Sequence, residues 1–343
     1  MKRVAIVILN WNGKHFLEKF LPDVIRFSSE LARVVVADNA STDDSISFLE
    51  KNFPEVKIIR NDKNYGFTGG YNVALKNLND EFFVLLNSDV EVTEGWLQPL
   101  LSFMDTHPNT AACQPKIRSY SDRNMFEHAG AAGGYIDFLG YPFCRGRIYN
   151  TLEEDHGQYD DAQPVFWATG ACLFIRSTVY HQQGGFDDAF FAHMEEIDLC
   201  WRIQHTGMDI YVIPQSVVYH VGGGTLPKSN PRKTYYNFRN NLMMLFKNLP
   251  GHQLIWLIPI RLFLDGAAGI KFLFEGDYKD TFAVLKAHFS FYYMVITSFP
   301  KRMRQQKHVV KHASKGIYHK SIAKAYYLNK TKYFNALQKE DFS

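Results

Sequence analysis

Four short apolar runs in the first ninety residues constrain the fold of this chain more than any other feature. They are VAIVIL (4–9), RVVVAD (33–38), VKIIRN (56–61) and EFFVLLNSD (81–89), and each is followed or ended by polar residues. Runs of this length, rich in branched apolar side chains, are typical of strands buried on both faces of a parallel sheet. We therefore expect the central sheet of an α/β domain.

The segments between these runs have the spacing of amphipathic helices. They read GKHFLEKFLPDVIRFS, TDDSISFLEKNF and GGYNVALKNLN, and Ser41 and Thr42 are predicted to cap the second of them. Strands that alternate with helices at this spacing form βαβ units. The predicted fold class is therefore a doubly wound, mainly parallel sheet.

Composition limits the class of protein. With 343 residues and 46% hydrophobic residues, the chain can bury a large core, which excludes a disordered protein. The four cysteines are widely spaced and form no CxxC pair, so we expect neither a disulfide framework nor a zinc site, and we place the chain in a reducing, cytoplasmic environment. The N-terminal apolar run is too short for a signal peptide.

The amino-acid composition changes twice along the chain. From about residue 110 to 225 it is rich in glycine and aromatic residues, and EHAGAAGGYIDFLGYPFCRGR is predicted to be an ordered loop region. After residue 230 the chain becomes helical and apolar. We divide it into 1–112, 113–228 and a C-terminal helical region, 229–343.

The C-terminal region indicates contact with a membrane surface. Residues 252–274 have the length of a membrane span, but Arg261, Asp265 and Lys271 interrupt it, each at a cost of about 2.5–3.5 kcal/mol near a bilayer centre. Pro259 is expected to kink this helix. Residues 281–307 combine aromatic residues with a basic flank, so we expect helices that lie in the membrane interface. The alternative is a pair of ordinary helices that pack on the domain.

Polar residues follow each of the four predicted strands, in NWNG, DNASTDDS, NDKNYGFTGGYN and NSDVEV. Ligands of open α/β sheets bind beyond the carboxyl ends of the strands, although turns also favour these residue types. Asp38 is suited to accept hydrogen bonds from a base or a ribose, and Asp89 to hold Mg²⁺ or Mn²⁺ beside a diphosphate. The glycines of YGFTGGYN are expected to offer free N–H groups to a phosphate or a ribose. Neither GxGxxG nor a P-loop is present, which argues against a dehydrogenase or an NTPase.

A second feature is the acidic segment EEIDLCWR, in which Glu195, Glu196 and Asp198 stand among apolar residues. Carboxylates are rarely buried unless they are paired or take part in chemistry. On a helix, Glu195 and Glu196 project about 100° apart and serve different points. Asp198 and Arg202 have the i, i+4 spacing of a helical ion pair.

Together these motifs resemble the inverting glycosyltransferases of family 2, particularly rhamnosyltransferase-like bacterial members, which have the GT-A fold. The motifs VILNWNG, VVVADNASTDDS, NYGFTGGYN, LLNSDVEV, WATGACLFIR and EEIDLCWR occur in the order of that family, over about residues 3 to 225. The resemblance implies that 1–112 binds a nucleotide sugar and 113–228 carries the acceptor and catalytic half. Inverting transfer needs a base for the acceptor hydroxyl and positive charge for the departing phosphate.

The resemblance also implies the donor and metal residues. Asp89 matches the last acid of an Asp-x-Asp metal motif whose first acid is here Asn87, and His220 matches a histidine that completes the metal site in some members, although it can also be an ordinary polar residue. A cation site of this kind implies Mg²⁺ or Mn²⁺. The implied donor-binding residues are Asn10, Asn12, Asp38, Asn39, Asn64, Gly66, Gly70 and Asn87.

Glu196 aligns with the catalytic base of the family, and Glu195 is expected to orient the site, bind an acceptor hydroxyl or serve as the base itself. Asp198 is expected to anchor the helix through Arg202, whose charge would favour ionised Glu196. The implied acceptor-binding residues lie in WATGACLFIR, where the tryptophan can also be a simple core residue; they are Trp167, Thr169 and Gly170.

We therefore expect a metal-dependent glycosyltransferase that uses a UDP- or dTDP-sugar and a saccharide or lipid-linked saccharide acceptor, in cell-surface polysaccharide synthesis. Residues 301–343 carry a net charge of about +9, which favours a peripheral place on the inner face of the cell membrane. No nucleic-acid partner is expected. One alternative is a non-catalytic sugar-nucleotide-binding subunit. Another is a nucleotidyltransferase, for which NWNGKHF lacks the usual Gly-rich basic loop.

Overall fold

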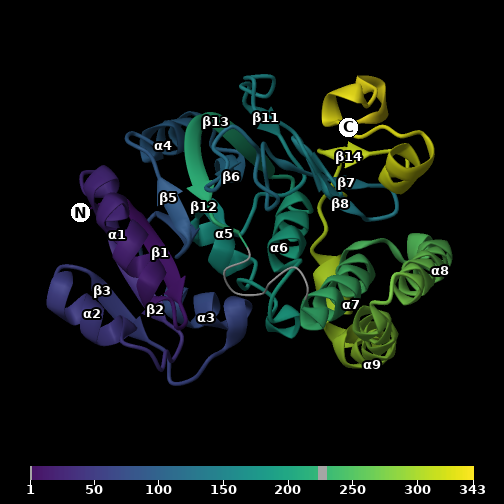
Figure 1. The fold of residues 1–343 in the computed structure, drawn as a ribbon, viewed down its shortest axis with the longest axis horizontal. Coiled ribbons are helices and arrows are strands. Elements are labelled where there is room, and N and C mark those ends of the chain that lie inside the picture. Colours follow the sequence, from purple (N-terminus) through teal and green to yellow (C-terminus); the bar gives the residue numbers. More distant parts are fainter. Residues whose placement is uncertain (1, 223–229) are drawn as a thin grey trace.

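The computed structural model describes residues 2–222 and 230–343 and is built on one large mixed sheet (Figure 1). Its strand order is β11-β13-β6-β12-β4-β1-β2-β3, with β5 added beside β13. The four predicted strands are confirmed and pair in parallel as neighbours; they are β1 (Val4–Asn10), β2 (Ala32–Asp38), β3 (Lys57–Arg60) and β4 (Phe82–Asn87). The predicted α/β class is confirmed.

The other half of the sheet is mixed. β12 lies antiparallel between β4 and β6, so β6 runs parallel to β4, and β13 runs parallel to β6. The carboxyl ends of β6 and β13 therefore lie at the same edge as those of β1, β2 and β4. The strands of this half are β5 (Val90–Val92), β6 (Thr110–Ser119), β11 (Gln163–Pro164), β12 (Cys172–Arg176) and β13 (Asp209–His220).

Helices cover both faces of the sheet because its central strands are apolar on both sides. In β1, Val4, Ile6 and Ile8 contribute to one core, and Ala5 and Val7 contribute to the other. The first core is covered by α1 (Lys14–Ser28), α2 (Ser45–Asn52) and α4 (Leu97–Thr106), and the second by α3 (Gly66–Leu75), α5 (Ser177–Gln182) and α6 (Glu195–Gln204).

The predicted caps of α2 are wrong. The helix begins at Ser45 after Asp44, and Asp44 makes no side-chain capping bond. Ser41 Oγ instead accepts hydrogen bonds from Asn10 Nδ2 and the N–H of Asn12, and the N–H of Thr42 donates to Asn12 Oδ1. These residues join the ends of β1 and β2 to each other rather than starting the helix.

A smaller sheet lies beside the large one, and part of it comes from the segment predicted to be a loop. The C-terminal strand β14 pairs in parallel with β7, so the tail of the chain returns to the domain. All four cysteines are buried and unpaired. The small sheet has the order β10 (Thr151–Leu152), β9 (Arg147–Ile148), β8 (Pro142–Cys144), β7 (Gly134–Asp137) and β14 (Ile317–Tyr318).

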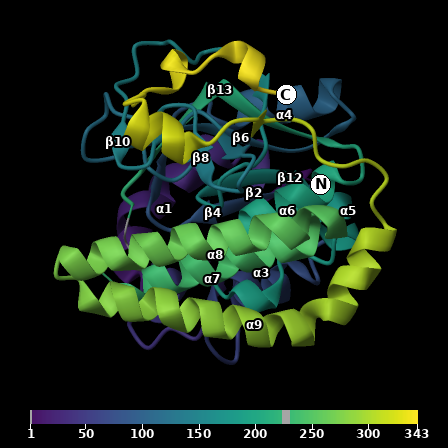
Figure 2. The ribbon, with the colours of Figure 1, turned by 90° about the vertical axis from the view of Figure 1, so that its right-hand side faces the viewer.

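Three long helices, α7 (Pro231–Asn248), α8 (Gly251–Phe274) and α9 (Tyr278–Lys307), extend side by side along one flank of the molecule (Figure 2). α8 continues through Pro259, and no described helix is long and apolar enough to cross a membrane. The division of the chain at 228 stays a prediction, since residues 223–229 lie outside the described part. Short helical turns complete the chain at Asp188–Phe190, Lys324–Leu328, Phe334–Ala336 and Lys339–Asp341.

Candidate active site

Several of the predicted donor residues meet at the edge where β1, β2 and β4 end. Asn10 is paired in register with Asp38, and Leu9 with Asn87. Asn10 Nδ2 donates to Asp38 Oδ1 at 3.0 Å, and Asp38 Oδ2 accepts the N–H of Ser41 at 3.0 Å. Asn10 Oδ1 is buried without a hydrogen-bond partner, so this group has an unused acceptor.

The exposed side chain of Asn12 builds a loop. Asn12 has a φ of 52°, and its Oδ1 accepts the N–H groups of Thr42 at 2.7 Å and Asp43 at 3.3 Å. Asparagine tolerates this left-handed conformation better than most residues. Asn12 therefore fixes the loop after β1 against the loop after β2.

A second group joins the end of β2 to the start of α3. Asn39 Nδ2 donates to Asn64 Oδ1 and to the carbonyl of Gly66, both at 3.0 Å, and Asn64 Oδ1 also accepts the N–H of Gly66 at 2.8 Å. The N–H groups of Phe67 and Thr68 donate to the carbonyl of Phe191. The prediction that the glycine-rich helix start offers free N–H groups is therefore wrong for these first positions.

The two glycines of this group are required by close contacts. Gly66 has a φ of +72°, and a Cβ there would lie 2.6 Å from the ring of Phe191. A Cβ on Gly70 would lie 2.8 Å from Leu9 and 3.1 Å from Asn39 Nδ2. α3 can thus approach β1 and the loop before α6 only with glycine at these positions.

Asp89 and His220 face each other across the ends of β4 and β13. Asp89 Oδ1 lies 3.2 Å from His220 Nε2, and His220 Nδ1 lies 3.2 Å from Glu127 Oε2. Burial disfavours the charged imidazole, but the two adjacent carboxylates outweigh it and raise the pKa of His220 to about 10. Burial by itself raises the pKa of the Glu127 carboxyl, yet the adjacent His220 keeps that pKa below its usual value.

This pair fits a divalent cation once the imidazole of His220 has released its proton. Neighbouring ligands of an octahedral ion at about 2.1 Å lie roughly 3 Å apart, which matches the distance between Asp89 and His220. A carboxylate that holds the other nitrogen of a ligating histidine is also usual at metal sites, and Glu127 has that place. The described residues contain no group of three or more acids, histidines or cysteines arranged as a complete site. A cation here would need further ligands from a bound substrate or water.

The predicted catalytic acids lie in the first turn of α6. Glu195 is buried, and the Oε2 atoms of Glu195 and Glu196 are both buried without a hydrogen-bond partner. Burial raises the pKa of Glu196 to about 7, and burial together with the charge of Glu196 raises the pKa of Glu195 well above its usual value. Glu196 is therefore a carboxyl that can take up a proton near neutral pH.

Glu196 lies close to the loop that contacts the end of β4. A Cβ on Gly170 would lie 3.9 Å from Glu196 Cβ, and the next residue, Ala171, accepts the N–H of Asn87 through its carbonyl at 3.0 Å. Asn87 precedes Asp89 by two residues. The start of the acid helix and Asp89 thus both lie near the carboxyl end of β4.

Asp198 is the centre of a buried ion network, as its predicted structural role requires. It accepts Arg202 Nε at 2.9 Å, Lys247 Nζ at 2.8 Å and Asn248 Nδ2 at 2.9 Å. Lys247 also pairs with Asp187 at 2.7 Å. The prediction that Arg202 keeps Glu196 ionised is wrong, because the guanidinium is occupied by Asp198 and two backbone carbonyls.

Trp167 and Thr169 are tied into the core. The indole N–H of Trp167 donates to the carbonyl of Tyr135 at 3.0 Å, and its ring lies against Gly134, where a Cβ would be 2.1 Å away. The N–H of Thr169 donates to Gln114 Oε1. These contacts are structural, and acceptor binding by this segment stays a prediction.

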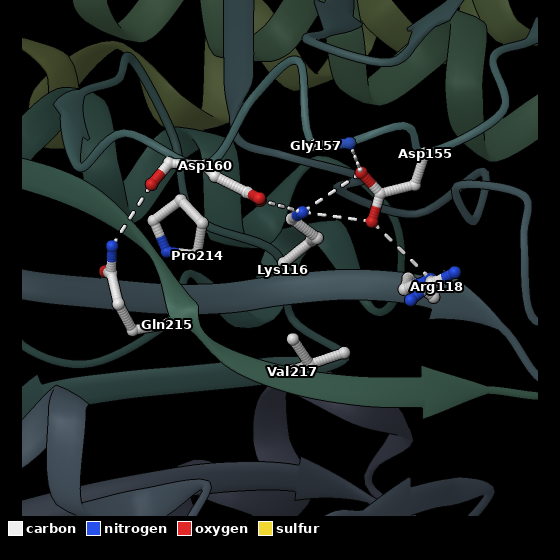
Figure 3. Close-up of a pocket in the computed structure, with 8 residues that line it drawn as sticks. All are labelled: Lys116, Arg118, Asp155, Gly157, Asp160, Pro214, Gln215 and Val217. Carbon is white, nitrogen blue, oxygen red and sulfur yellow. Dashed lines mark hydrogen bonds and ion pairs between the residues drawn. The ribbon is translucent and has the colours of Figure 1, made fainter.

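A cavity of about 460 Å³ lies at another place, between β6, β13 and the loop 155–160 (Figure 3). Lys116 pairs there with Asp155 and Asp160, and Arg118 lies 3.6 Å from Asp155. Its lining contains none of the predicted site residues, and its charges are compensated internally. We therefore place the candidate active site at the sheet edge and not in this cavity.

Comparisons with known proteins show the family of the chain. The model of "Glycosyl transferase family 2" matches residues 5–181. The N-acetylglucosaminyl-diphospho-decaprenol L-rhamnosyltransferase of Mycobacterium tuberculosis is 27% identical over 284 residues, which are 78% of this chain and 91% of that protein. The low-salt glycan biosynthesis hexosyltransferase Agl10 of Haloferax volcanii is 24% identical over 212 residues, which are 60% of this chain and 63% of that protein.

Two solved structures have a similar fold. GalNAc-T7 with UDP, GalNAc and Mn²⁺ has a TM-score of 0.57 and 16% identity, over 72% of this chain and 48% of that chain. The mannosyltransferase PcManGT from Pyrobaculum calidifontis, in complex with GDP-Man and Mn²⁺, has a TM-score of 0.53 and 13% identity, over 89% of this chain and 84% of that chain.

Proposed function

Because the chain belongs to glycosyl transferase family 2 and is a glycosyltransferase of GT-A fold, we propose that it moves a sugar with inversion from a UDP- or dTDP-sugar to a hydroxyl of a saccharide or lipid-linked saccharide. The observation that carries the proposal is the Oε2 atom of half-buried Glu196, which is buried and has no hydrogen-bond partner, on a residue close to the loop at the end of β4. The mycobacterial relative is named for a diphospho-decaprenol substrate, which supports a lipid-linked acceptor.

In the proposed reaction, Glu196 accepts the proton of the acceptor hydroxyl while the hydroxyl oxygen bonds to the anomeric carbon. The bond between that carbon and the diphosphate oxygen breaks, and the nucleoside diphosphate leaves with its electron pair. A base with a pKa of about 7 is well matched to this proton transfer at neutral pH. Glu195, whose Oε2 atom is also without a hydrogen-bond partner, is proposed to orient the acceptor.

Asp89 and His220 would hold Mg²⁺ or Mn²⁺, and Glu127 would orient the imidazole. When bound, the cation would supply positive charge to the diphosphate. The imidazole favours Mn²⁺ over Mg²⁺. At the other end of the donor, Asp38 and Asn10 are proposed to bind the nucleoside, with Asn10 Oδ1 as the unused acceptor.

The outer surface of α8 and α9 supports a place at the membrane. Arg261 and Asp265, which interrupt the apolar run of α8, are buried against the domain, so the outward side is strongly apolar. The exposed charged residues within these two helices are all basic, and they are Lys271, Lys279, Lys286, Lys301, Arg304 and Lys307. The most exposed apolar residues of this α8–α9 face are Ile255, Phe263, Phe274, Phe282, Phe289, Tyr293 and Ile296.

An apolar surface with aromatic residues and a cationic rim is typical of proteins that lie on an anionic bilayer. We therefore propose peripheral binding to the inner face of the cell membrane through the α8–α9 face. This placement would bring the site near a lipid-linked acceptor.

The reaction is tested by screening UDP- and dTDP-sugars for Mg²⁺- or Mn²⁺-stimulated transfer or hydrolysis, with the anomeric configuration of the product read by NMR. Inverted product from one donor supports the proposal. Retained configuration would contradict the single displacement. Donor binding without any turnover on the correct acceptor would favour a non-catalytic sugar-nucleotide-binding subunit.

A further inference from the structure

The loop directly before the acid helix has an unusual backbone. Phe191, His193 and Met194 have φ values of 65°, 69° and 70°, although none of them is glycine. This left-handed region is disfavoured for residues with a Cβ, and such residues persist only where the surroundings hold them. The next residues in the chain are Glu195 and Glu196, so the conformation of this loop sets the position of the first turn of α6 and of both side chains.

Two adjacent residues of α7 hold the loop. Asn240, which is fully buried, directs its Nδ2 at the carbonyls of Phe190, Ala192 and His193, at 3.0, 2.8 and 2.7 Å. Arg239 donates from its second terminal nitrogen to the carbonyls of Ala189 and Phe190, both at 2.9 Å. The left-handed residues turn these carbonyls toward α7, where the side chains of Arg239 and Asn240 supply the donors.

The opposite side of the loop is held by α3. The carbonyl of Phe191 accepts the N–H groups of Phe67 and Thr68, at 2.9 and 3.3 Å, and the ring of Phe191 closes against Gly66. The loop thus lies between the donor half of the domain and α7. Because α7 belongs to the C-terminal region, that region contributes directly to the geometry of the site.

We infer that Arg239 and Asn240 are positioning residues, which fix residues 189–194 so that the Oε2 atom of Glu196 is buried and left without a hydrogen-bond partner. The inference rests on the proposed function, in which Glu196 is the base. Gly170, which lies near Glu196 from another element, carries no charge. Glu195 and Cys200 of the same helix are titratable groups that interact with Glu196.

The inference is tested with Asn240→Asp, which keeps the size of the side chain but removes its donors. We expect kcat to fall at least tenfold while the Kd of the donor changes less than threefold, because the donor residues lie on other elements. The acidic limb of the pH–rate profile should move to lower pH, since a loosened loop lets water reach Glu196. Arg239→Lys, which removes the forked donor but keeps the charge, should shift both quantities in the same direction and by less.

The matched control is Asn241→Ala. Asn241 is also buried in α7, but it donates to the carbonyl of Gly140 and accepts from Arg261, away from the loop. This variant should lower the Tm while keeping the pH–rate profile of the wild type. If Asn240→Asp and Asn241→Ala lose kcat equally and neither shifts the pH–rate profile, Arg239 and Asn240 serve only in packing, and the inference is overturned.

If Asn240→Asp does not fold, Arg239→Lys decides the question by the same two readouts, and an unshifted profile with normal kcat refutes the inference. Glu196→Gln separates this failure from that of the proposed function. If Glu196→Gln turns over at the full rate, Glu196 is not the base, and the inference fails together with the proposed function. If turnover collapses in Glu196→Gln but Asn240→Asp behaves as the wild type, only the positioning role of Arg239 and Asn240 is refuted, and Glu196 stays the proposed base.

Discussion

Replacing Glu196 by glutamine should stabilise the folded protein at alkaline pH while it removes activity. Burial raises the pKa of Glu196 from 4.5 to about 7. A carboxyl with a higher pKa in the folded state binds its proton more tightly there, so the folded state loses stability as the pH rises from about 4.5 to about 7. At about 1.4 kcal/mol for each pH unit, the full cost of ionising this group reaches roughly 3 kcal/mol.

Glutamine avoids that cost but leaves an amide without a partner, which costs about 1–3 kcal/mol when buried. The amide cost is the same at every pH, so we expect the stability of Glu196→Gln relative to the wild type to rise by about 2–3 kcal/mol between about pH 5 and about pH 8, as measured by urea unfolding at both pH values. Glu30→Gln, at an exposed position, is the control and should show no such difference. If the difference in stability between Glu196→Gln and the wild type is independent of pH, Glu196 is not a buried, unpartnered carboxyl.

Three other predictions concern separate parts of the molecule. Asp89→Ala should make donor affinity insensitive to Mg²⁺ and Mn²⁺ in a binding titration, and an unchanged metal response would remove Asp89 from the cation site. Asp198→Asn should lower the free energy of unfolding by about 3–5 kcal/mol, because it leaves buried Lys247 short of a counter-charge, and a loss below about 1 kcal/mol would contradict the network. The double variant Phe263→Glu and Phe289→Glu, at residues that are 76% and 74% exposed, should weaken sedimentation with anionic vesicles by more than about 100-fold, since losing roughly 1.5–3 kcal/mol for each phenylalanine removes about 3–6 kcal/mol. Val73→Glu on α3 is its control, and equal binding by both variants would exclude the α8–α9 face.

The sequence alone predicts the first half of the sheet well, because β1, β2, β3 and β4 are continuous apolar runs that only a doubly covered parallel sheet can bury. It also locates the polar residues at the strand ends, since parallel strands end at the same edge. The small sheet escapes prediction because its strands are two to four residues long and one of them, β14, comes from the far end of the chain. Periodicity carries no signal over such lengths.

The parts of the site that depend on long-range contacts are also missed. Glu127 stands in EHAG with no pattern that connects it to His220, and only the pairing of β6 with β13 brings the two together. Arg239 and Asn240 look like ordinary helix residues until the loop before α6 is folded against them. The pairing of Asp198 with Arg202 is predicted because it is local, whereas Lys247 is supplied by another helix.

The central claim is that Glu196 removes the proton of the acceptor hydroxyl. The most direct test is a single-turnover measurement on Glu196→Gln beside a titration of donor binding. We expect the transfer rate to fall by about 10²–10⁴-fold while the Kd of the donor stays within about threefold of the wild type. A transfer rate within about threefold of the wild type, with the donor bound normally, would contradict the claim.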